Sequence, residues 1–139
     1  MTKQRDTVVV GIDGSECSRK ALTWAETYAS AVDADLKLVT AWHWLTSYGV
    51  PLAYEGFDPA EDARKMVEAA AAELRVVPVD RIHTVVEQGP AGNVLVDASK
   101  GATALVVGTR GHGTLAGALL GSTSSFCMHH APCPVVVVR

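Results

Sequence analysis

Five short apolar segments alternate with helical patterns along the chain, and this alternation limits the possible folds more than any other feature of the sequence. Each segment is a nearly unbroken run of small and branched apolar residues, which is typical of parallel strands covered by helices on both faces. The repeated order of strand and helix predicts a three-layer α/β sandwich with a five-stranded, mostly parallel sheet and right-handed crossovers. We expect strands at residues 6–12, 35–42, 81–87, 103–107 and 134–139, and helices after residue 15, at 58–74, at 91–99 and from 122.

Length and composition predict one compact domain over residues 1–139, since 139 residues leave no room for a second. Hydrophobic residues make up 48% of the chain and charged residues 19%, as in an ordinary globular protein. A net charge of -3 argues against general nucleic-acid or membrane-surface binding, which favours a basic face. The first residues lack the apolar core of a signal peptide, and three cysteines without a framework spacing suit a reducing compartment. We therefore expect a cytoplasmic protein.

The glycine-rich stretch from Gly108 to Ser125 joins the fourth expected strand to the helix that follows it. Its glycines allow close approach of the backbone, and the hydroxyl residues 122–125 open a helix whose unpaired N–H groups and positive dipole end favour an anion. Arg110 and His112 could add positive charge, and no carboxylate follows Asp97 to oppose it. We interpret this stretch as an anion site.

Two other readings of these glycines fit less well. Residues 111–116 match a dinucleotide-binding fingerprint, but no acidic residue follows at the distance needed to hold a ribose. A Walker A loop needs Gly-Lys-Ser/Thr, which the sequence lacks. A glycine-rich turn that serves only tight packing remains an open alternative.

Asp13 is the clearest candidate for side-chain chemistry, because it follows the first strand at the same sheet edge as Gly108. Ligands of open α/β sheets bind outside the carboxyl ends of strands where the strand order reverses, so these two strands are expected to be neighbours. The carboxylate of Asp13 could accept hydrogen bonds from a ribose or an adenine, or help to hold magnesium. Asp-Gly-Ser is also a common turn, with Ser15 as a helix cap.

The spacing Gly108-x2-Gly111-x9-Gly121-Ser122 resembles the ATP-binding signature of the universal stress protein family, and the segments VVVGIDGS and HAPCPVVVVR resemble its two ends. The resemblance implies a Rossmann-like sheet of order 3-2-1-4-5, ATP as the ligand, and a homodimer through the last strand, Pro134 to Arg139. It implies that the glycines contact phosphate and ribose, that Ser122 and Ser124 donate hydroxyls to phosphate, and that Ala41 borders the adenine. The family commonly carries arginine where this chain has His112. The residues expected at the nucleotide are Asp13, Ala41, Gly108, Arg110, Gly111, Gly121, Ser122, Thr123 and Ser124.

Two further segments allow alternative interpretations. The long connection from His43 to Phe57 is either a flap over the nucleotide or a loop whose aromatic residues pack on the core. The run from Cys127 to Cys133 contains four potential metal ligands, but their spacing does not match the separated pairs of zinc sites, so we expect no metal there.

These features predict a nucleotide-dependent stress or signalling module that binds ATP, with magnesium as a further partner, and is at most a slow ATPase. Fast phosphoryl transfer needs a placed metal, a positioned nucleophile and several cations, and the sequence offers few of these. The alternatives are an adenylyl-transfer enzyme on a similar sheet, an FMN carrier, and a dimeric partner-binding module that uses no nucleotide.

Overall fold

The computed structural model describes residues 5–43, 46–47, 50–51, 56, 58–110 and 120–139. Its main sheet has five strands in the order β5-β2-β1-β6-β7, and every neighbouring pair is parallel. Numbered by their position in the chain, these strands have the order 3-2-1-4-5, which confirms the expected topology. The strands are β1 Thr7–Gly11, β2 Asp35–Trp42, β5 Ile82–Gln88, β6 Ala104–Gly108 and β7 Val135–Val138.

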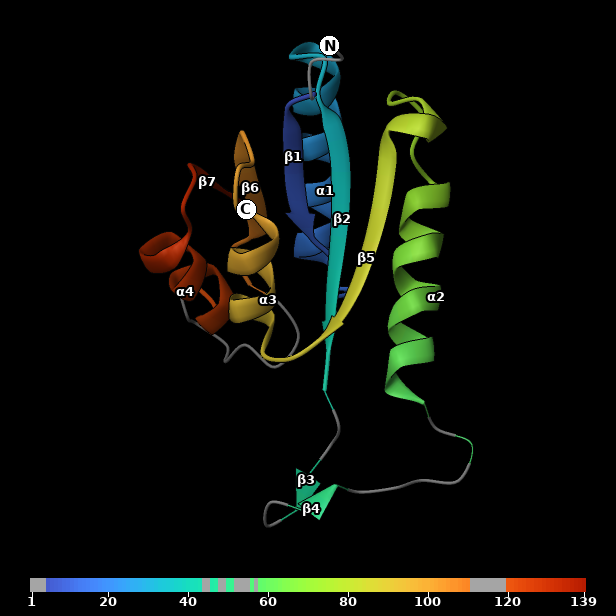
Figure 1. The fold of residues 1–139 in the computed structure, drawn as a ribbon, viewed down its shortest axis with the longest axis vertical. Coiled ribbons are helices and arrows are strands. Elements are labelled where there is room, and N and C mark those ends of the chain that lie inside the picture. Colours follow the sequence, from blue (N-terminus) through green and yellow to red (C-terminus); the bar gives the residue numbers. More distant parts are fainter. Residues whose placement is uncertain (1–4, 44–45, 48–49, 52–55, 57, 111–119) are drawn as a thin grey trace.

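Helices cover both faces of this sheet (Figure 1). They are α1 Glu16–Ala31, α2 Pro59–Ala72, α3 Ala91–Ala98 and α4 Ser122–His130, with a short 3₁₀ turn, η1, at Val79–Arg81. Successive strand residues alternate between the faces, so Val8 and Val10 pack with α1 and α2, whereas Val9 packs on the side of α3 and α4. All three valines are fully buried, so the sheet is the shared wall of two apolar cores.

The segment expected to be irregular from His43 to Phe57 contains a short antiparallel ribbon, which corrects that expectation. Its strands are β3 Thr46–Ser47 and β4 Val50–Pro51, and Figure 1 shows them beyond the carboxyl edge of the main sheet. Strands of two residues are too short for periodicity to reveal, and a proline argues against a strand in sequence reasoning. Most of the other residues of this segment, including the aromatic ones of the predicted flap, lie outside the described residues.

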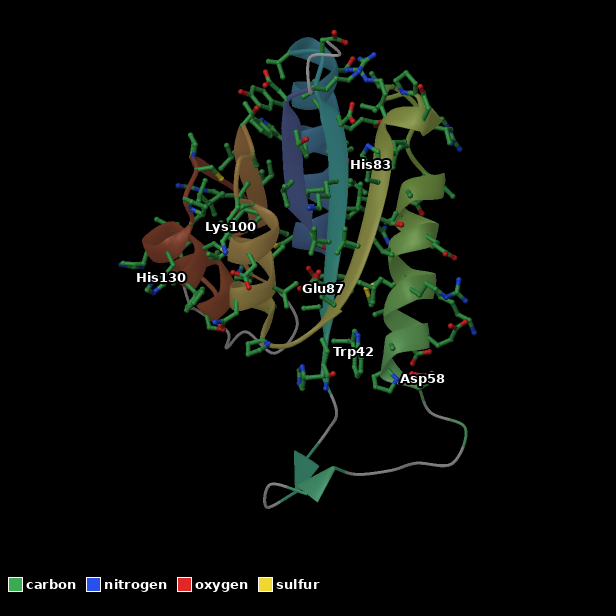
Figure 2. The ribbon with its side chains drawn as sticks, viewed as in Figure 1. Trp42, Asp58, His83, Glu87, Lys100 and His130 are labelled. Carbon is green, nitrogen blue, oxygen red and sulfur yellow. The ribbon has the colours of Figure 1, made fainter. Side chains whose placement is uncertain are left out.

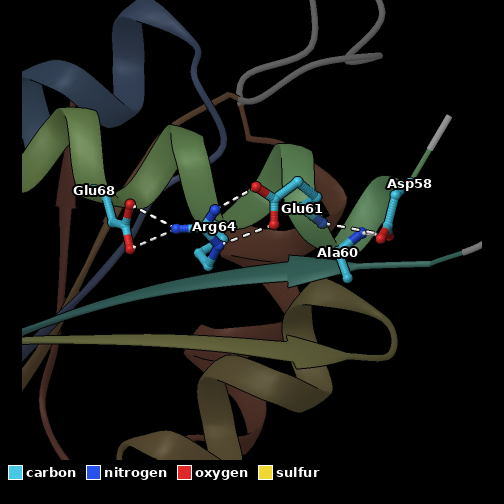
Figure 3. A network of polar contacts seen from close by, with 5 residues as sticks. All are labelled: Asp58, Ala60, Glu61, Arg64 and Glu68. Carbon is cyan, nitrogen blue, oxygen red and sulfur yellow. Dashed lines mark hydrogen bonds and ion pairs between the residues drawn. The ribbon is translucent and has the colours of Figure 1, made fainter. Parts of the chain in front are cut away.

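Helices α1 and α2 each begin after a residue whose side chain caps the helix. Ser15 caps α1 by accepting a hydrogen bond from the amide of Ser18, and Asp58 caps α2 by accepting from the amides of Ala60 and Glu61 (Figure 3). Arg64 then forms ion pairs with Glu61 and Glu68 along the exposed face of α2. No helix in the described part of the chain is long and apolar enough to cross a membrane.

A buried carboxylate joins α1 to the connection that follows α2. Oε2 of Glu26 accepts hydrogen bonds from the backbone amides of Arg75, Val76 and Val77, at 3.0, 2.8 and 3.2 Å. Glu26 is only 8% exposed. One side chain therefore holds three consecutive amides of the chain that leads into β5.

A cluster of ionic side chains lies at the amino ends of β2 and β5, where Figure 2 shows His83. Asp35 accepts from Arg81 at 3.4 Å and pairs with His83 at 3.0 Å, while Arg81 also forms an ion pair with Asp33 at 2.7 Å. Partial burial alone would raise the pKa of the Asp35 carboxyl, but the hydrogen bonds with His83 and Arg81 outweigh it and hold this pKa below its usual value.

The lowered pKa of Asp35 predicts a small stabilisation that depends on pH. A carboxyl whose pKa is lower in the folded state stabilises the fold above its unfolded pKa, and this contribution is lost as the pH falls through the folded value. Asp35→Asn is therefore expected to lower the free energy of unfolding at pH 7 by about 1 kcal/mol or less. Urea titrations should show the difference from wild type shrinking as the pH falls below about 4. Asp97→Asn, in a well-exposed pair with Lys100, is the control; a difference for Asp35→Asn that persists at pH 2 would contradict the argument.

Candidate functional site

A cavity of about 380 Å³ lies at the carboxyl ends of β1 and β6. These two strands are neighbours, while β2 pairs on the other side of β1, so the strand order reverses at this point. Such a switch point is where open α/β sheets bind ligands. The floor is formed by the strand ends, and the walls come from the segments that enter α1, α3 and α4.

The structure brings together the site residues predicted from the sequence. Eight of the nine line this single cavity, although they come from three strand ends and the start of one helix. The ninth, Gly111, lies outside the described residues, as does His112. The eight are Asp13, Ala41, Gly108, Arg110, Gly121, Ser122, Thr123 and Ser124.

Sequence reasoning missed the wall that the β5–α3 connection contributes. Gly89, Pro90, Ala91 and Leu95 line the cavity from this side, and His43 lines it where β2 ends. The sequence did contain a signal for this wall, because Gly89-Pro90 follows the third expected strand and the carboxyl ends of parallel strands meet at one sheet edge. The signal was weak because Gly89, Pro90, Ala91 and Leu95 carry no polar side-chain group that suggests ligand binding.

The start of α4 is held in place by a clasp of hydrogen bonds around Thr109. The carbonyl of Thr109 accepts from the amide of Gly121 at 2.6 Å and from the hydroxyl of Ser124 at 3.2 Å. The amide of Thr109 donates to the carbonyl of Val138, at 2.9 Å, so the last strand supports the same point. The described ends of the glycine-rich connection are therefore fixed relative to each other.

These hydrogen bonds give Ser124 a different role from its neighbours Ser122 and Thr123. Ser124 is 2% exposed, and its hydroxyl faces the carbonyls of Thr109 and Gly121, the latter at 3.0 Å. A hydroxyl has one proton to donate, so in this arrangement Ser124 organises the helix start. Ser122 is exposed and Thr123 half-buried, and both line the cavity. Their hydroxyls are better placed to reach a ligand.

Two helices begin at the cavity without a side-chain cap. The N-cap of α4 is Gly121 and that of α3 is Pro90, and neither makes a side-chain hydrogen bond to its helix. Both N-termini line the cavity, through Ala91 and through Ser122 with Thr123. The first amides of a helix need acceptors, and the positive ends of two helix dipoles favour negative charge. With the nearby Arg110, this side of the cavity suits an anion.

Asp13 supplies a carboxylate to the wall between the end of β1 and the start of α1. Its Oδ1 accepts from the amide of Ser15 at 2.8 Å and from the hydroxyl of the same residue, an Asx turn that orients the side chain. The hydroxyl of Thr40, which is buried, donates to the carbonyl of Ile12 at 3.0 Å and fixes the backbone just before Asp13. The cavity therefore combines a side that suits an anion with one oriented acceptor.

The two cysteines of the segment from Cys127 to Cys133 pack in the core, whereas His129 and His130 between them are exposed. Cys127 is fully buried, and burial raises the pKa of its thiol to about 11, so it stays protonated at neutral pH. Cys133 is half-buried and packs in the same apolar cluster. His130 lies against the ring of Phe126, and His129 contacts the carbonyl of Ser125. Within the described residues, no three potential ligands gather in a way that could hold a metal ion.

Comparison with known proteins agrees with this architecture. The sequence matches the Universal stress protein family over residues 4–139. It is 36% identical over 133 residues to the universal stress protein Rv2624c of Mycobacterium tuberculosis, an alignment covering 96% of this chain and 48% of that protein. The chain spans about half the length of the first curated relatives that it matches.

Solved structures show the same fold. UspA from Lactobacillus plantarum superposes with a TM-score of 0.69 at 23% identity, covering 99% of this chain and 100% of that one. A universal stress protein in complex with cAMP superposes with a TM-score of 0.62 at 28% identity, covering 99% of this chain and 98% of that one. The family match spans nearly the whole chain and the solved relatives share its fold, so the chain belongs to the universal stress protein family.

Proposed function

We propose that this chain binds an adenine nucleotide, ATP, in the cavity between β1 and β6 and acts as a nucleotide-dependent stress or signalling module. The observation that carries the proposal is the convergence of two uncapped helix N-termini, those of α3 and α4, on one cavity beside Arg110. Backbone amides and dipole ends in this arrangement suit phosphate groups.

The remaining walls suit a nucleoside. Ile12, Val39 and Leu95 provide apolar surface for a base, and Asp13 provides an oriented acceptor for a ribose hydroxyl or an exocyclic amine. The relative that was solved with cAMP supports an adenine nucleotide as the class of ligand. Two helix N-termini and an arginine favour several phosphates over one, and for this reason we propose ATP.

Magnesium fits this arrangement, because it binds through one or two carboxylates together with the phosphates of a nucleotide. Asp13 is the one carboxylate of the described lining, so it would hold the ion in place of its contact with the nucleoside, and the ion would neutralise phosphate charge. The described lining contains one carboxylate, one arginine and no lysine. We therefore propose a binding protein with at most slow hydrolysis, since fast phosphoryl transfer requires more cations and a positioned nucleophile.

We also propose that two copies associate through the segment from Pro134 to Arg139. Its strand β7 is at one end of the sheet order, and its four valines are each half-buried. An apolar edge strand can pair with a second copy about a twofold axis. Light scattering of the purified chain would report the mass of the assembly.

The binding proposal is tested by replacing Gly121, the N-cap of α4, with valine. Gly121 is buried and lines the cavity, so the branched side chain would fill space beside the amides that are proposed to hold phosphate. We expect wild type to release ATP on denaturation, as identified by mass spectrometry. Calorimetric titration should show ATP affinity at least about tenfold lower in Gly121→Val.

The control variant is Ala72→Val, which adds similar bulk at the exposed end of α2. It should bind ATP like wild type. Parallel titrations with AMP and cAMP rank the adenine nucleotides. Equal ATP affinity in Gly121→Val and wild type, or no binding of any nucleotide by wild type, would refute the proposal.

A further inference from the structure

Where α3 packs against α4, one of the contacts leaves no space for a further side-chain atom. Gly92 is the second residue of α3, and a methyl group placed on it would come within 2.6 Å of Cδ1 and 2.9 Å of Cγ of Phe126. These atoms belong to an aromatic ring rather than to the free end of a flexible chain. The ring also packs against that of His130, whose centre is 4.3 Å away. Figure 2 shows His130 on α4.

Helix formation gives no reason for a glycine at this position. Glycine loses more backbone freedom on folding than any other residue, and Gly92 lies in the first turn of a helix of only eight residues. Gly92 does not adopt a positive φ, so its backbone conformation is open to any residue. Close approach to Phe126 is therefore the physical reason for glycine at this position.

This contact lies between the two helix starts that form the anion side of the cavity. Ala91 precedes Gly92 directly and lines the cavity, and Phe126 lies one turn beyond Ser122 and Thr123, which also line it. The aromatic side chain of a helical residue points back toward the N-terminus of its helix. The ring of Phe126 thus acts as a spacer between the N-terminal turns of α3 and α4.

We propose that Gly92 and Phe126 are positioning residues that set the separation of the α3 and α4 N-termini, and so the fit of the cavity to a polyphosphate. The inference rests on the proposed nucleotide binding. Neither residue lines the cavity; both act through the helix starts beside them. Because the first amides of both helices must reach one ligand, a shift of α4 by a few tenths of an ångström weakens the contacts with phosphate. Helix α4 carries none of the residues proposed to contact the base, so the base pocket stays in place.

The test compares ATP with adenosine in calorimetric titrations of wild type and Gly92→Ala. ATP affinity is expected to fall by about fivefold, the weight of a helix-terminus interaction with an anion, while adenosine affinity changes less than about twofold. Asn93→Ala is the matched control, since it introduces alanine at the next, exposed position of α3 and should leave both affinities unchanged. Gly92→Ala/Phe126→Ala, which removes the two atoms nearest the new methyl group, should bind ATP more tightly than Gly92→Ala.

The outcomes separate this inference from the proposed function. Wild type that binds neither ligand refutes nucleotide binding itself. Wild type that binds ATP, with Gly92→Ala binding it equally well or losing ATP and adenosine to the same degree, refutes the spacer alone. Should Gly92→Ala unfold at the assay temperature, Phe126→Ala decides the matter: a loss selective for ATP supports the spacer, and an equal loss for both ligands refutes it.

Discussion

Gly108→Ala is expected to lower the free energy of unfolding by about 2–3 kcal/mol, the range for overpacking of a tight core. A methyl group on Gly108 would come within 2.7 Å of Cβ, 2.8 Å of the carbonyl carbon and 2.9 Å of the carbonyl oxygen of Cys17. Two of these atoms are backbone of the first turn of α1, so no side-chain rotation can relieve the clash. Either α1 or the end of β6 must move, and both border the cavity.

The measurement is guanidinium-induced unfolding followed by circular dichroism, with Gly11→Ala as the matched control. Gly11 ends β1 as Gly108 ends β6, but the atoms nearest its added methyl group would be the side-chain methyls of Leu95, at 3.0 and 3.2 Å. Leu95 can change its rotamer, so we expect a cost of about 1 kcal/mol or less. Equal losses in the free energy of unfolding for Gly108→Ala and Gly11→Ala would show that the close contact with the α1 backbone does not restrict the size of residue 108.

Glu26→Ala is expected to cost about 3 kcal/mol of the free energy of unfolding, because a charged acceptor of three hydrogen bonds is lost. The amide of Val77 would be left in a buried position, whereas water can reach the exposed residues Arg75 and Val76. The chain between α2 and β5 would lose its attachment to α1. Amide hydrogen exchange should accelerate at residues 75–77 more than in the strands.

Two variants delimit this prediction. Glu26→Gln keeps one acceptor oxygen and should cost about half as much, since hydrogen bonds to a neutral oxygen are weaker. Glu16→Ala removes an exposed glutamate from the first turn of the same helix and should cost less than about 1 kcal/mol. A cost for Glu26→Ala no larger than that for Glu16→Ala would contradict the role of the buried carboxylate.

The sequence predicted the architecture because its signals are local. Five apolar runs and the caps at Ser15 and Asp58 each act within a few residues, and the five strands lie within two residues of their expected bounds. Eight of the nine expected site residues line one cavity for a related reason: parallel strands end at one edge, so residues after different strands meet there.

The contacts that the sequence did not reveal join distant segments. The backbone amides that donate to Glu26 lie about fifty residues further along the chain. Helical periodicity places Glu26 on α1, but it does not predict that the carboxylate accepts hydrogen bonds from these amides. The Gly92 contact with Phe126 joins two helices whose packing depends on the whole sheet. Ser124 was expected to donate its hydroxyl to phosphate, yet this hydroxyl faces two backbone carbonyls, which only the folded geometry reveals.

The clasp at Thr109 implies an order of events when the chain folds. Its carbonyl is held by Gly121 and Ser124, but its amide is held by Val138, so the support of the glycine-rich connection includes β7. A chain emerging from the ribosome contains β1, α1 and β2 well before β7, and long-range pairings form late. We therefore expect the cavity to become able to hold a ligand only after β7 has been synthesised and docked.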